Sequence, residues 1–271
     1  MRKALTYLLM IMLAVVLMGP FIWLTFTALK SGQDVFRLES IKDIFPTSPT
    51  LKNFKEVMIQ MPQLPRFFLN TIIIVVVGIF LQLLLCSLTA YPLARIDFPG
   101  KNLIFAVILS AMMLPAQANM IVNFITIRKL GLYNTLIAVI LPGAVTVFGI
   151  FLMRQAYIVI PKEVEDAARI DGCGEFTIWY RIMLPLTRPA LATLAIFSFV
   201  AFWNTFMWPL VILRSKELYP LAVGLTYLMN TFDTNFRLVA AGSVLSMIPV
   251  IIVFILMQKQ FVKGITAGAV K

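Results

Sequence analysis

The distribution of charged residues constrains this chain more than any other feature of its sequence. Six stretches of 21 to 28 residues contain no Asp, Glu, Lys or Arg: residues 4–29, 67–94, 102–127, 130–153, 189–213 and 238–258. A helix needs about 20 mostly apolar residues to cross a hydrocarbon layer about 30 Å thick, and every stretch is long enough. Only helices or the strands of a closed barrel satisfy their backbone hydrogen bonds in lipid. Barrel strands alternate apolar and polar residues, which these stretches do not.

The sequence therefore predicts an all-α, polytopic membrane protein with six transmembrane helices. Composition agrees, because 61% of the residues are apolar and 13% are charged, about half the charged fraction of globular domains. Arg2 and Lys3 precede the first stretch, as in a signal peptide. That stretch is about twice as long as a signal-peptide core and lacks a convincing small-residue cleavage site, so we expect a retained span.

An even number of spans places both termini on one side of the membrane. Cations divide almost equally between the two sides, but the termini together hold five Lys or Arg and no acid. Six cations from Lys30 to Arg66 lie in a long segment, which the positive-inside rule discounts. We therefore expect cytoplasmic termini. The net charge of +11 then reflects anchoring at the membrane surface rather than nucleic-acid binding.

The sequence lacks the residues that several classes of function require. The chain has no histidine, which excludes Ser-His-Asp catalysis and imidazole-ligated metals. The six stretches hold no ionisable group of the kind that proton-coupled carriers use, although sodium held by carbonyls and hydroxyls stays open. Gly100-Lys101 lacks the rest of a phosphate-binding loop. We expect no catalytic residue, metal or cofactor in this chain, so ATP-driven transport would require a separate ATPase and a docking surface for it.

The longest predicted inner segment, residues 154–188, is where such a surface belongs. Its first part predicts a short helix, because Pro161 suits the first helical position and Gly172 a left-handed C-terminal cap. Acidic residues in the first turn complement the helix dipole, and Glu165 can pair with Arg169 at i,i+4.

A second helix is predicted to follow directly. Phe176, Trp179, Tyr180 and Met183 fall at i, i+3, i+4 and i+7 and predict one apolar stripe, which Leu184-Pro185 terminates. The small alanines at 167 and 168 would let another protein approach the first helix closely. Helix chemistry alone equally allows an ordinary solvated hairpin.

A resemblance to a known family rests on residues of this loop at fixed spacing: Asp166-Ala167-Ala168, Gly172, Ile182, Leu184 and Pro185. Their spacing resembles the signature loop of permease subunits in bacterial binding-protein-dependent ABC importers, Glu-Ala-Ala, three residues, Gly, nine residues, Ile-x-Leu-Pro. Asp replaces Glu at 166, with Glu165 adjacent. Segments 91–100, 129–135, 203–210 and 261–270 resemble the maltose-permease-G-like branch, which imports sugars. The resemblance extends from about residue 45 to the C-terminus.

The resemblance implies a type I ABC importer permease (MetI-like) fold in a bacterial inner membrane. It implies a first transmembrane helix and an external amphipathic segment in residues 1–65, a permease core in 66–261 with a cytoplasmic coupling loop at 154–188, and a cytoplasmic tail at 262–271. It also implies partners: a second permease, which we expect to be a different homologous chain, two ATPase subunits that bind ATP and Mg, and an extracytoplasmic solute-binding protein. The coupling residues it implies are Glu165, Asp166, Ala167, Ala168 and Gly172 in the coupling helix, and Ile182, Leu184 and Pro185, which anchor it.

A sugar pathway needs amides and stacking aromatic rings in a cavity. Pro115, Asn119 and Asn123 recur every four residues and predict one polar stripe on the third span. Asn204 and Trp208 are four apart on the fifth span, and prolines 20, 115, 142 and 249 predict kinks in four spans. The pathway candidates are Gln82, Gln117, Asn119, Asn123, Trp203, Asn204 and Trp208. Each could instead bridge helices or, for tryptophan, anchor at the interface.

Two predicted outer segments, Ser31 to Arg66 and Arg214 to Arg237, could contact a receptor or merely connect spans. The leading interpretation is the permease subunit of an ATP-driven sugar importer, which forms half of the translocation pathway and couples to its ATPase through residues 162–185. The alternatives are an importer of a non-sugar solute and a self-sufficient carrier or channel. A membrane enzyme lacks an acid, base or metal cluster at membrane depth.

Overall fold

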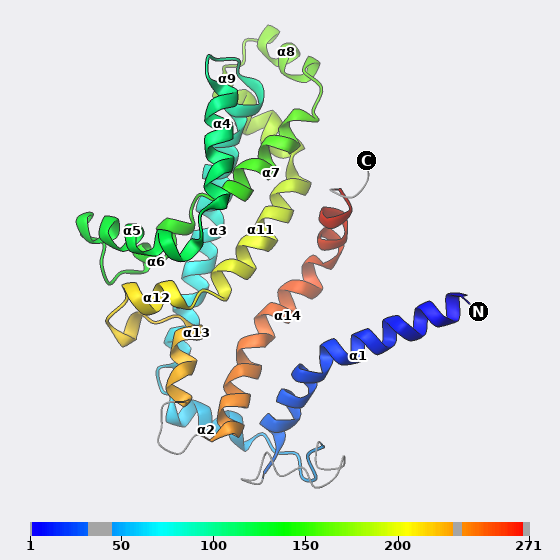
Figure 1. Cartoon of the computed structure of the whole chain (residues 1–271), viewed down its shortest axis with the longest axis vertical. Coiled ribbons are helices and arrows are strands. Elements are labelled where there is room, and N and C mark those ends of the chain that lie inside the picture. Colours follow the sequence, from blue (N-terminus) through cyan, green and yellow to red (C-terminus); the bar gives the residue numbers. More distant parts are fainter. Residues whose placement is uncertain (1, 32–44, 230–234, 268–271) are drawn as a thin grey trace. The chain divides into compact units, whose positions relative to one another are not determined.

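The computed structural model describes residues 2–31, 45–229 and 235–267, and these ranges contain helices and no strand (Figure 1). Parts of the predicted external segment (32–44), of the second outer segment (230–234) and of the tail (268–271) lie outside the described residues. The chain forms two compact units. One consists of Met1–Pro65 and Leu221–Ile252, and the other of Arg66–Pro220 and Val253–Lys271.

The first unit begins with α1 (Arg2–Leu29), which carries Pro20 in its interior. Residues 5–18 of α1 are exposed, residues 23–26 are half-buried, and Thr27 and Ala28 in its last turn are buried. There α2 (Lys52–Gln60) is tied to the end of α1, because Asn53 Nδ2 donates to the carbonyls of Ala28 (2.7 Å) and Lys30 (2.9 Å). The unit also contains α13 (Leu221–Gly224), η6 (Leu225–Leu228) and the first part of α14 (Phe236–Ala267), in which Pro249 lies.

The second unit is built around α3 (Leu64–Arg95), an uninterrupted helix of 32 residues. It continues with α4 (Lys101–Ser110), η2 (Ala111–Met113), α5 (Ala116–Lys129), α6 (Leu136–Ile140), η3 (Leu141–Gly143) and α7 (Val147–Ile158). After α7 come α8 (Glu163–Ile170), α9 (Glu175–Thr177), the π-helical η4 (Ile178–Met183), α10 (Leu184–Leu186) and α11 (Arg188–Trp203). Short helices α12 (Met207–Ile212) and η5 (Lys216–Leu218) complete it.

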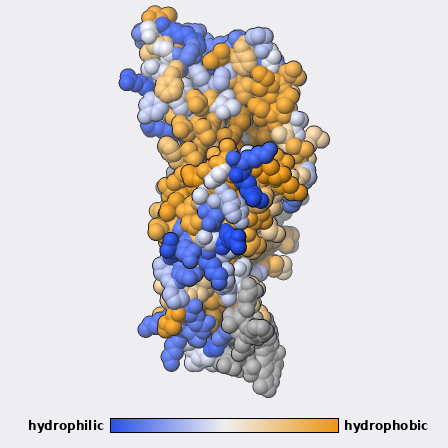
Figure 2. Space-filling model, turned by 90° about the vertical axis from the view of Figure 1, so that its left-hand side faces the viewer, coloured by the Kyte–Doolittle hydropathy of each residue, from blue (hydrophilic) through white to orange (hydrophobic). Residues whose placement is uncertain are grey.

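The predicted spans correspond to three continuous helices and three bent pairs. Leu5–Leu29, Leu64–Arg95 and Phe236–Gln258 are each long and apolar enough to cross a membrane. The bent pairs are Lys101–Met113 with Gln117–Lys129 (109°), Leu136–Gly143 with Val147–Ile158 (49°), and Glu175–Leu186 with Arg188–Trp203 (78°). Counting each pair as one span gives the six that the charge-free stretches predict. The exposed surface of these helices is rich in large apolar side chains, as the face in Figure 2 shows.

The third and fourth spans bend close to Pro115 and Pro142, as these prolines predict, whereas the break within the fifth charge-free stretch was not predicted. Leu114 is extended (ψ 130°) because the following Pro115 disfavours a helical conformation before it, and α5 starts after that proline. The fourth stretch breaks between η3 and Thr146, whose Oγ1 accepts the Gly149 N–H (3.1 Å) and starts α7. The fifth stretch breaks after Trp203, so that Trp208 lies on α12.

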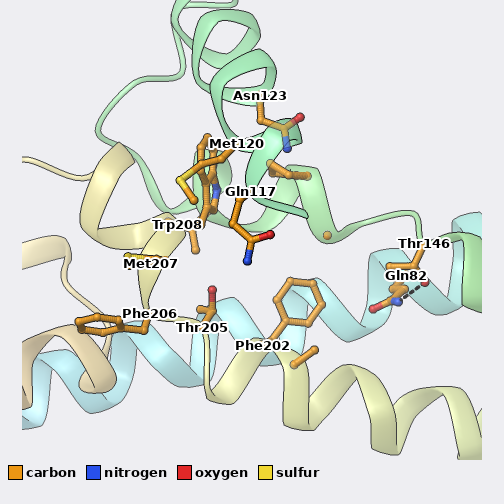
Figure 3. A pocket seen from close by; sticks show the side chains of 14 residues that line it. Gln82, Gln117, Met120, Asn123, Thr146, Phe202, Thr205, Phe206, Met207 and Trp208 are labelled. Atoms are coloured by element: carbon orange, nitrogen blue, oxygen red, sulfur yellow. Dashed lines mark hydrogen bonds between the residues drawn. The ribbon is translucent and has the colours of Figure 1, made fainter. Parts of the chain in front are cut away.

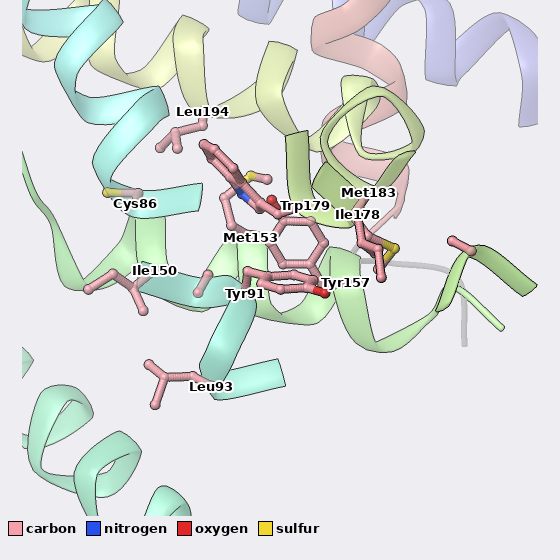
Figure 4. Close-up of a cluster of buried hydrophobic side chains, with 12 residues drawn as sticks. Cys86, Tyr91, Leu93, Ile150, Met153, Tyr157, Ile178, Trp179, Met183 and Leu194 are labelled. Carbon is pink, nitrogen blue, oxygen red and sulfur yellow. The ribbon is translucent and has the colours of Figure 1, made fainter. Parts of the chain in front are cut away.

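A buried cluster in the second unit joins α3, α7 and η4 (Figure 4). Trp179 and Tyr157 are its largest buried side chains, and the rings of Tyr91 and Tyr157 meet edge to face with centroids 5.8 Å apart. The predicted apolar stripe of the second loop helix is wrong in part. Trp179 and Met183 enter the cluster, whereas Phe176 and Tyr180 are 69% and 58% exposed. The π-turn at 178–183 changes the angle per residue, so the i, i+3, i+4, i+7 positions do not share one face.

Candidate functional site

The helix predicted in the loop is present as α8, two residues shorter at its start than Pro161 indicates. Glu163, Glu165 and Asp166 occupy its first turn. It ends in a paired cap, because Gly172 N–H donates to Arg169 O (3.0 Å) and Cys173 N–H donates to Ala168 O (2.9 Å). Gly172 has φ +82°, a conformation that L side chains adopt at a cost. We call residues 159–174, between α7 and α9, the α8 loop.

One face of α8 is pinned to the last turn of α3. Arg95 Nε lies 2.9 Å from Glu165 Oε1, and the two side chains are only 4% and 3% exposed. Arg95 Nη2 also donates to the carbonyl of Ile160, just before α8. Burial raises the pKa of Glu165 above its ordinary value, and the charges of Arg95 and Arg169 oppose that rise. A buried carboxylate of this kind depends on its cationic partner to remain charged.

Arg169 and Tyr91 extend this contact into a network. Arg169 lies within ion-pair distance of Glu165 (3.5 Å), Asp166 (3.1 Å) and Glu175 (2.9 Å). Tyr91, one turn before Arg95 on α3, donates its hydroxyl to Glu175 Oε2 (2.7 Å). The end of α3 therefore contacts the chain before α8, within α8 and after α8.

The opposite face of α8 is open. Ala167 and Ile170 are exposed, Ile170 by 86%, and the Asp166 side chain is 64% exposed. Ala168 is only 6% exposed and lies in the buried cluster, so the expectation that both alanines face a partner is wrong for Ala168. Each of the three proposed anchoring residues is half-buried: Ile182, Leu184 and Pro185.

A cavity of about 450 Å³ lies in the same unit (Figure 3). It is bounded by residues of α3, α5, α11 and α12 and by the break before α7, and none of the lining side chains is charged. The lining residues are Gln82, Gln117, Met120, Asn123, Val139, Pro142, Gly143, Thr146, Ala201, Phe202, Thr205, Phe206, Met207 and Trp208. Volumes of about 300–1,000 Å³ are typical of sites for small molecules.

Four of the seven pathway candidates line this cavity: Gln82, Gln117, Asn123 and Trp208. Gln82 is 5% exposed and donates Nε2 to Thr146 Oγ1 (2.8 Å), and Trp208 donates Nε1 to Ala138 O (2.9 Å). The cavity side of α5 thus carries Gln117 and Asn123, with Met120 between them.

The other three candidates do not line the cavity. Asn119 is exposed elsewhere on α5, so the predicted stripe of Pro115, Asn119 and Asn123 does not form one wall. Trp203 is 7% exposed and packs between Phe68 and Phe199. Asn204 donates a hydrogen bond from Nδ2 to the carbonyl of Val200 (2.9 Å) at the end of α11. The break after α11 separates Asn204 and Trp208, which an unbroken helix would align.

Sequence reasoning missed the lining residues that stand at the helix breaks, chiefly Thr146, Phe202 and Thr205. For Phe202, two glycines in the sequence mark positions without a side chain, where a large ring can pack. A Cβ on Gly78 would lie 2.7 Å from the Phe202 ring, and a Cβ on Gly143 would lie 2.9 Å from it. The ring therefore occupies the space that these two glycines leave open on neighbouring segments.

A second set of hydrogen bonds holds the α12 side of the cavity. Asn134 has φ 60°, a conformation that asparagine tolerates better than most residues. Its Oδ1 accepts the N–H groups of Arg214 (2.9 Å) and Ser215 (3.0 Å), and its Nδ2 donates to Ser215 Oγ (2.9 Å). With the Trp208 bond to Ala138, these contacts fix α12 against α6.

Comparison with known proteins shows the same architecture in transporters. The chain is 41% identical over 226 residues to the arabinooligosaccharides transport system permease protein AraQ of Halalkalibacterium halodurans, covering 83% of this chain and 81% of that protein. It is 36% identical to AraQ of Bacillus subtilis, over 100% of this chain and 96% of the relative. It is 32% identical to the lactose transport system permease protein LacG of Rhizobium radiobacter, over 93% and 90%.

A solved structure matches the fold over most of its length. The crystal structure of a bacterial ABC transporter involved in the import of the acidic polysaccharide alginate superposes with a TM-score of 0.84 and 27% identity, covering 95% of each chain. The family described as binding-protein-dependent transport system inner membrane component matches residues 82–267, which include the cavity, the α8 loop and α11. The chain belongs to this family, and it is a multi-pass membrane permease with the helical fold of an ABC importer subunit.

Proposed function

We propose that the protein is the permease subunit of an ATP-driven sugar importer in a bacterial inner membrane. It forms half of the translocation pathway, and a second homologous permease, a different chain, forms the other half. An extracytoplasmic solute-binding protein delivers the sugar. Two separate ATPase subunits bind ATP and Mg²⁺ and contact the α8 loop, and both termini share the cytoplasmic side with that loop.

The observation that carries the sugar assignment is the uncharged cavity. Its polar groups are the amides of Gln82, Gln117 and Asn123 and the hydroxyls of Thr146 and Thr205, beside the Trp208 indole. Amides and hydroxyls donate and accept hydrogen bonds, as the hydroxyls of a sugar do, and an aromatic face suits the apolar face of a sugar ring. The names of relatives support the same class, since AraQ and LacG are named for arabinooligosaccharides and lactose.

An uncharged lining also favours a neutral cargo. A carboxylate or an ammonium group that left water for this cavity would meet no charged partner among the lining residues. The related importer of alginate handles an acidic polysaccharide, so the two proteins would differ in this respect. We propose neutral oligosaccharides as the substrate class.

The α8 loop supports the coupling role. Its inner face is tied to α3 by buried and partly buried charges, and its outer face presents Ala167 and Ile170 without a covering segment among the described residues. A short helix that is rigidly held on one side and open on the other suits a contact with a second protein. The sequence lacks a phosphate-binding loop, which supports ATP hydrolysis on another subunit.

Reconstitution tests this function. The chain is co-expressed with the permease, ATPase and binding protein that are encoded beside it, and the complex is purified and placed in vesicles. Uptake of arabinotriose, lactose and a tri-galacturonate is then measured. We expect ATP-dependent uptake of at least one neutral sugar and none of the acidic trisaccharide. Uptake that a sodium or proton gradient drives without the ATPase would favour a secondary carrier. Amino acids and polyamines are assayed in parallel, and uptake restricted to them would place the protein among non-sugar importers.

A further inference from the structure

The end of α3 carries a set of contacts to α8 and to the chain on both sides of it. Arg95 contacts Glu165 within α8 and the Ile160 carbonyl before it, and Tyr91 contacts Glu175 after it. All these contacts come from the last two turns of one helix. The α8 loop is therefore held at three places by a single element.

The same helix reaches the cavity. Gln82 precedes Arg95 by 13 residues, which is about 20 Å along a helix that rises about 1.5 Å per residue. Between them α3 continues as one helix, with Pro92 inside it, whereas the chain on the other sides of the cavity breaks at Leu114, before Thr146 and after Trp203. At the cavity, Gln82 donates to Thr146, the residue that starts α7.

The Arg95–Glu165 contact is well suited to transmit a displacement. Both side chains are almost fully buried, and separating them would leave buried Arg95 without an anionic partner and Glu165 with only Arg169, 3.5 Å away. The buried cluster includes Tyr91 and Leu93 of α3 and Ala168 of α8, so the two helices are also joined by close apolar packing. Because separating this ion pair is energetically unfavourable, we expect α8 and the end of α3 to move together.

We propose that Arg95 is a positioning residue that links α8 to α3, so that a displacement of α8 moves the Gln82–Thr146 contact at the cavity. The proposal rests on the proposed function, because it takes the partner ATPase as the source of the displacement. Tyr91 has a supporting role, since its hydroxyl holds Glu175 and thereby the start of α9. Lys101 and Asp97, 3.3 Å apart near the same end of α3, have no such role because Asp97 is 89% exposed.

A reporter that needs no sugar tests the link. Thr205 lines the cavity and is half-buried, and Cys173 in the α8 loop is a half-buried free thiol, so Thr205→Cys is combined with Cys173→Ser. The complete complex with its ATPases is placed in lipid nanodiscs. The labelling rate of Thr205→Cys by a charged thiol reagent is measured without nucleotide and after trapping with ATP and vanadate, with ATP hydrolysis measured on the same samples.

Two variants of the link and one control are compared in this background. Glu165→Gln removes one charge and keeps the shape, and the pair Arg95→Met with Glu165→Leu replaces both charges by apolar groups, a change that buried ion pairs often tolerate. Asp97→Asn removes the exposed pair as a control. We expect the nucleotide-dependent change in labelling to fall about fivefold or more in both link variants, within the usual range of coupling between sites. ATP hydrolysis should persist, and Asp97→Asn should behave like the background.

An unchanged response in the apolar pair would overturn the proposal, and so would failure of both link variants to assemble, because the contact would then serve stability alone. A background complex that hydrolyses ATP but shows no change at Thr205→Cys would contradict the transport cycle assumed under the proposed function. A background complex that binds no ATPase would contradict the docking role of the α8 loop. Failure of the proposed function and failure of the link therefore give different results.

Discussion

At the scale of single residues, Gly172 determines how α8 ends. Its φ of +82° allows the two cap hydrogen bonds from Gly172 and Cys173, and no atom lies within 4 Å of a Cβ built on it. A substitution there is consequently strained by backbone conformation and not by crowding.

We expect Gly172→Val to insert in the membrane but to lose transport. The left-handed conformation costs an L residue about 1–2 kcal/mol, which is enough to loosen the end of α8. Thermal unfolding of the purified complex and uptake per ATP hydrolysed are the measurements. Gly174→Ala is the matched control, because Gly174 has φ −74° and open space around it. Equal uptake per ATP in the two variants would contradict a role for this cap.

A second residue-scale prediction compares two asparagines on α5. Asn123 lines the cavity and Asn119, one turn earlier, does not. We expect Asn123→Asp to lower uptake of a neutral sugar about tenfold, which is about 1.4 kcal/mol and near the low end of the cost of an unpaired buried charge. Asn119→Asp should leave uptake unchanged. A similar loss in both variants would show that α5 responds to charge anywhere and that the cavity assignment is wrong.

Residue spacing in the sequence identified the α8 loop but not the direction of each side chain. The order Asp166, Ala167, Ala168 and Gly172 is readable from the sequence, yet Ala168 turns inward and Ala167 outward. The difference depends on the end of α3, which lies more than 70 positions earlier in the chain. Periodicity within one short helix contains no information about such a distant neighbour.

At the scale of elements, Phe202 on α11 packs where α3 and η3 come close. Gly78 on α3 and Gly143 in η3 leave the space for its ring. We expect Gly78→Ala to force the ring toward the cavity, because a Cβ there would lie 2.7 Å from it, and to reduce both uptake and the thermal midpoint of the complex. Uptake and thermal stability are measured on the reconstituted complex.

The smaller side chain of Phe202→Leu should restore part of the stability in combination with Gly78→Ala, since the two positions share one space. Gly19→Ala is the control, because nothing lies within 4 Å of a Cβ on Gly19. A Gly78→Ala variant as stable as Gly19→Ala would contradict the close packing of α3 on α11.

The elements themselves were predictable to different degrees. Charge-free stretches predict that a segment can cross a membrane, and α1, α3 and α14 contain three of them. The same signal does not report continuity, because charge-free stretches lie in bent helix pairs as well as in continuous helices. Pro115 marked one break, whereas the break after Trp203 and the π-turn at 178–183 depend on tertiary packing that no local pattern encodes.

At the scale of the whole molecule, the chain joins an uncharged cavity to a protruding helical loop. The cavity residues, from Gln82 to Trp208, and the α8 loop belong to the same unit, and the loop contacts the end of α3. The matched family consists of inner membrane components of binding-protein-dependent transport systems, and the solved relative is an ABC transporter. Under the proposed function, transport requires that an ATPase outside this chain act on the α8 loop.

Cross-linking in the intact complex tests that requirement most directly. Ile170 is 86% exposed on α8, and Glu217 is an exposed residue of η5, so Ile170→Cys and Glu217→Cys are each introduced with Cys173→Ser. A short bifunctional thiol reagent is applied to membranes that contain the complete transporter. We expect Ile170→Cys to form a cross-link with the ATPase subunit and Glu217→Cys to form none. Labelling of Ile170→Cys from the external side of intact cells, with no cross-link to an ATPase, would contradict the central claim.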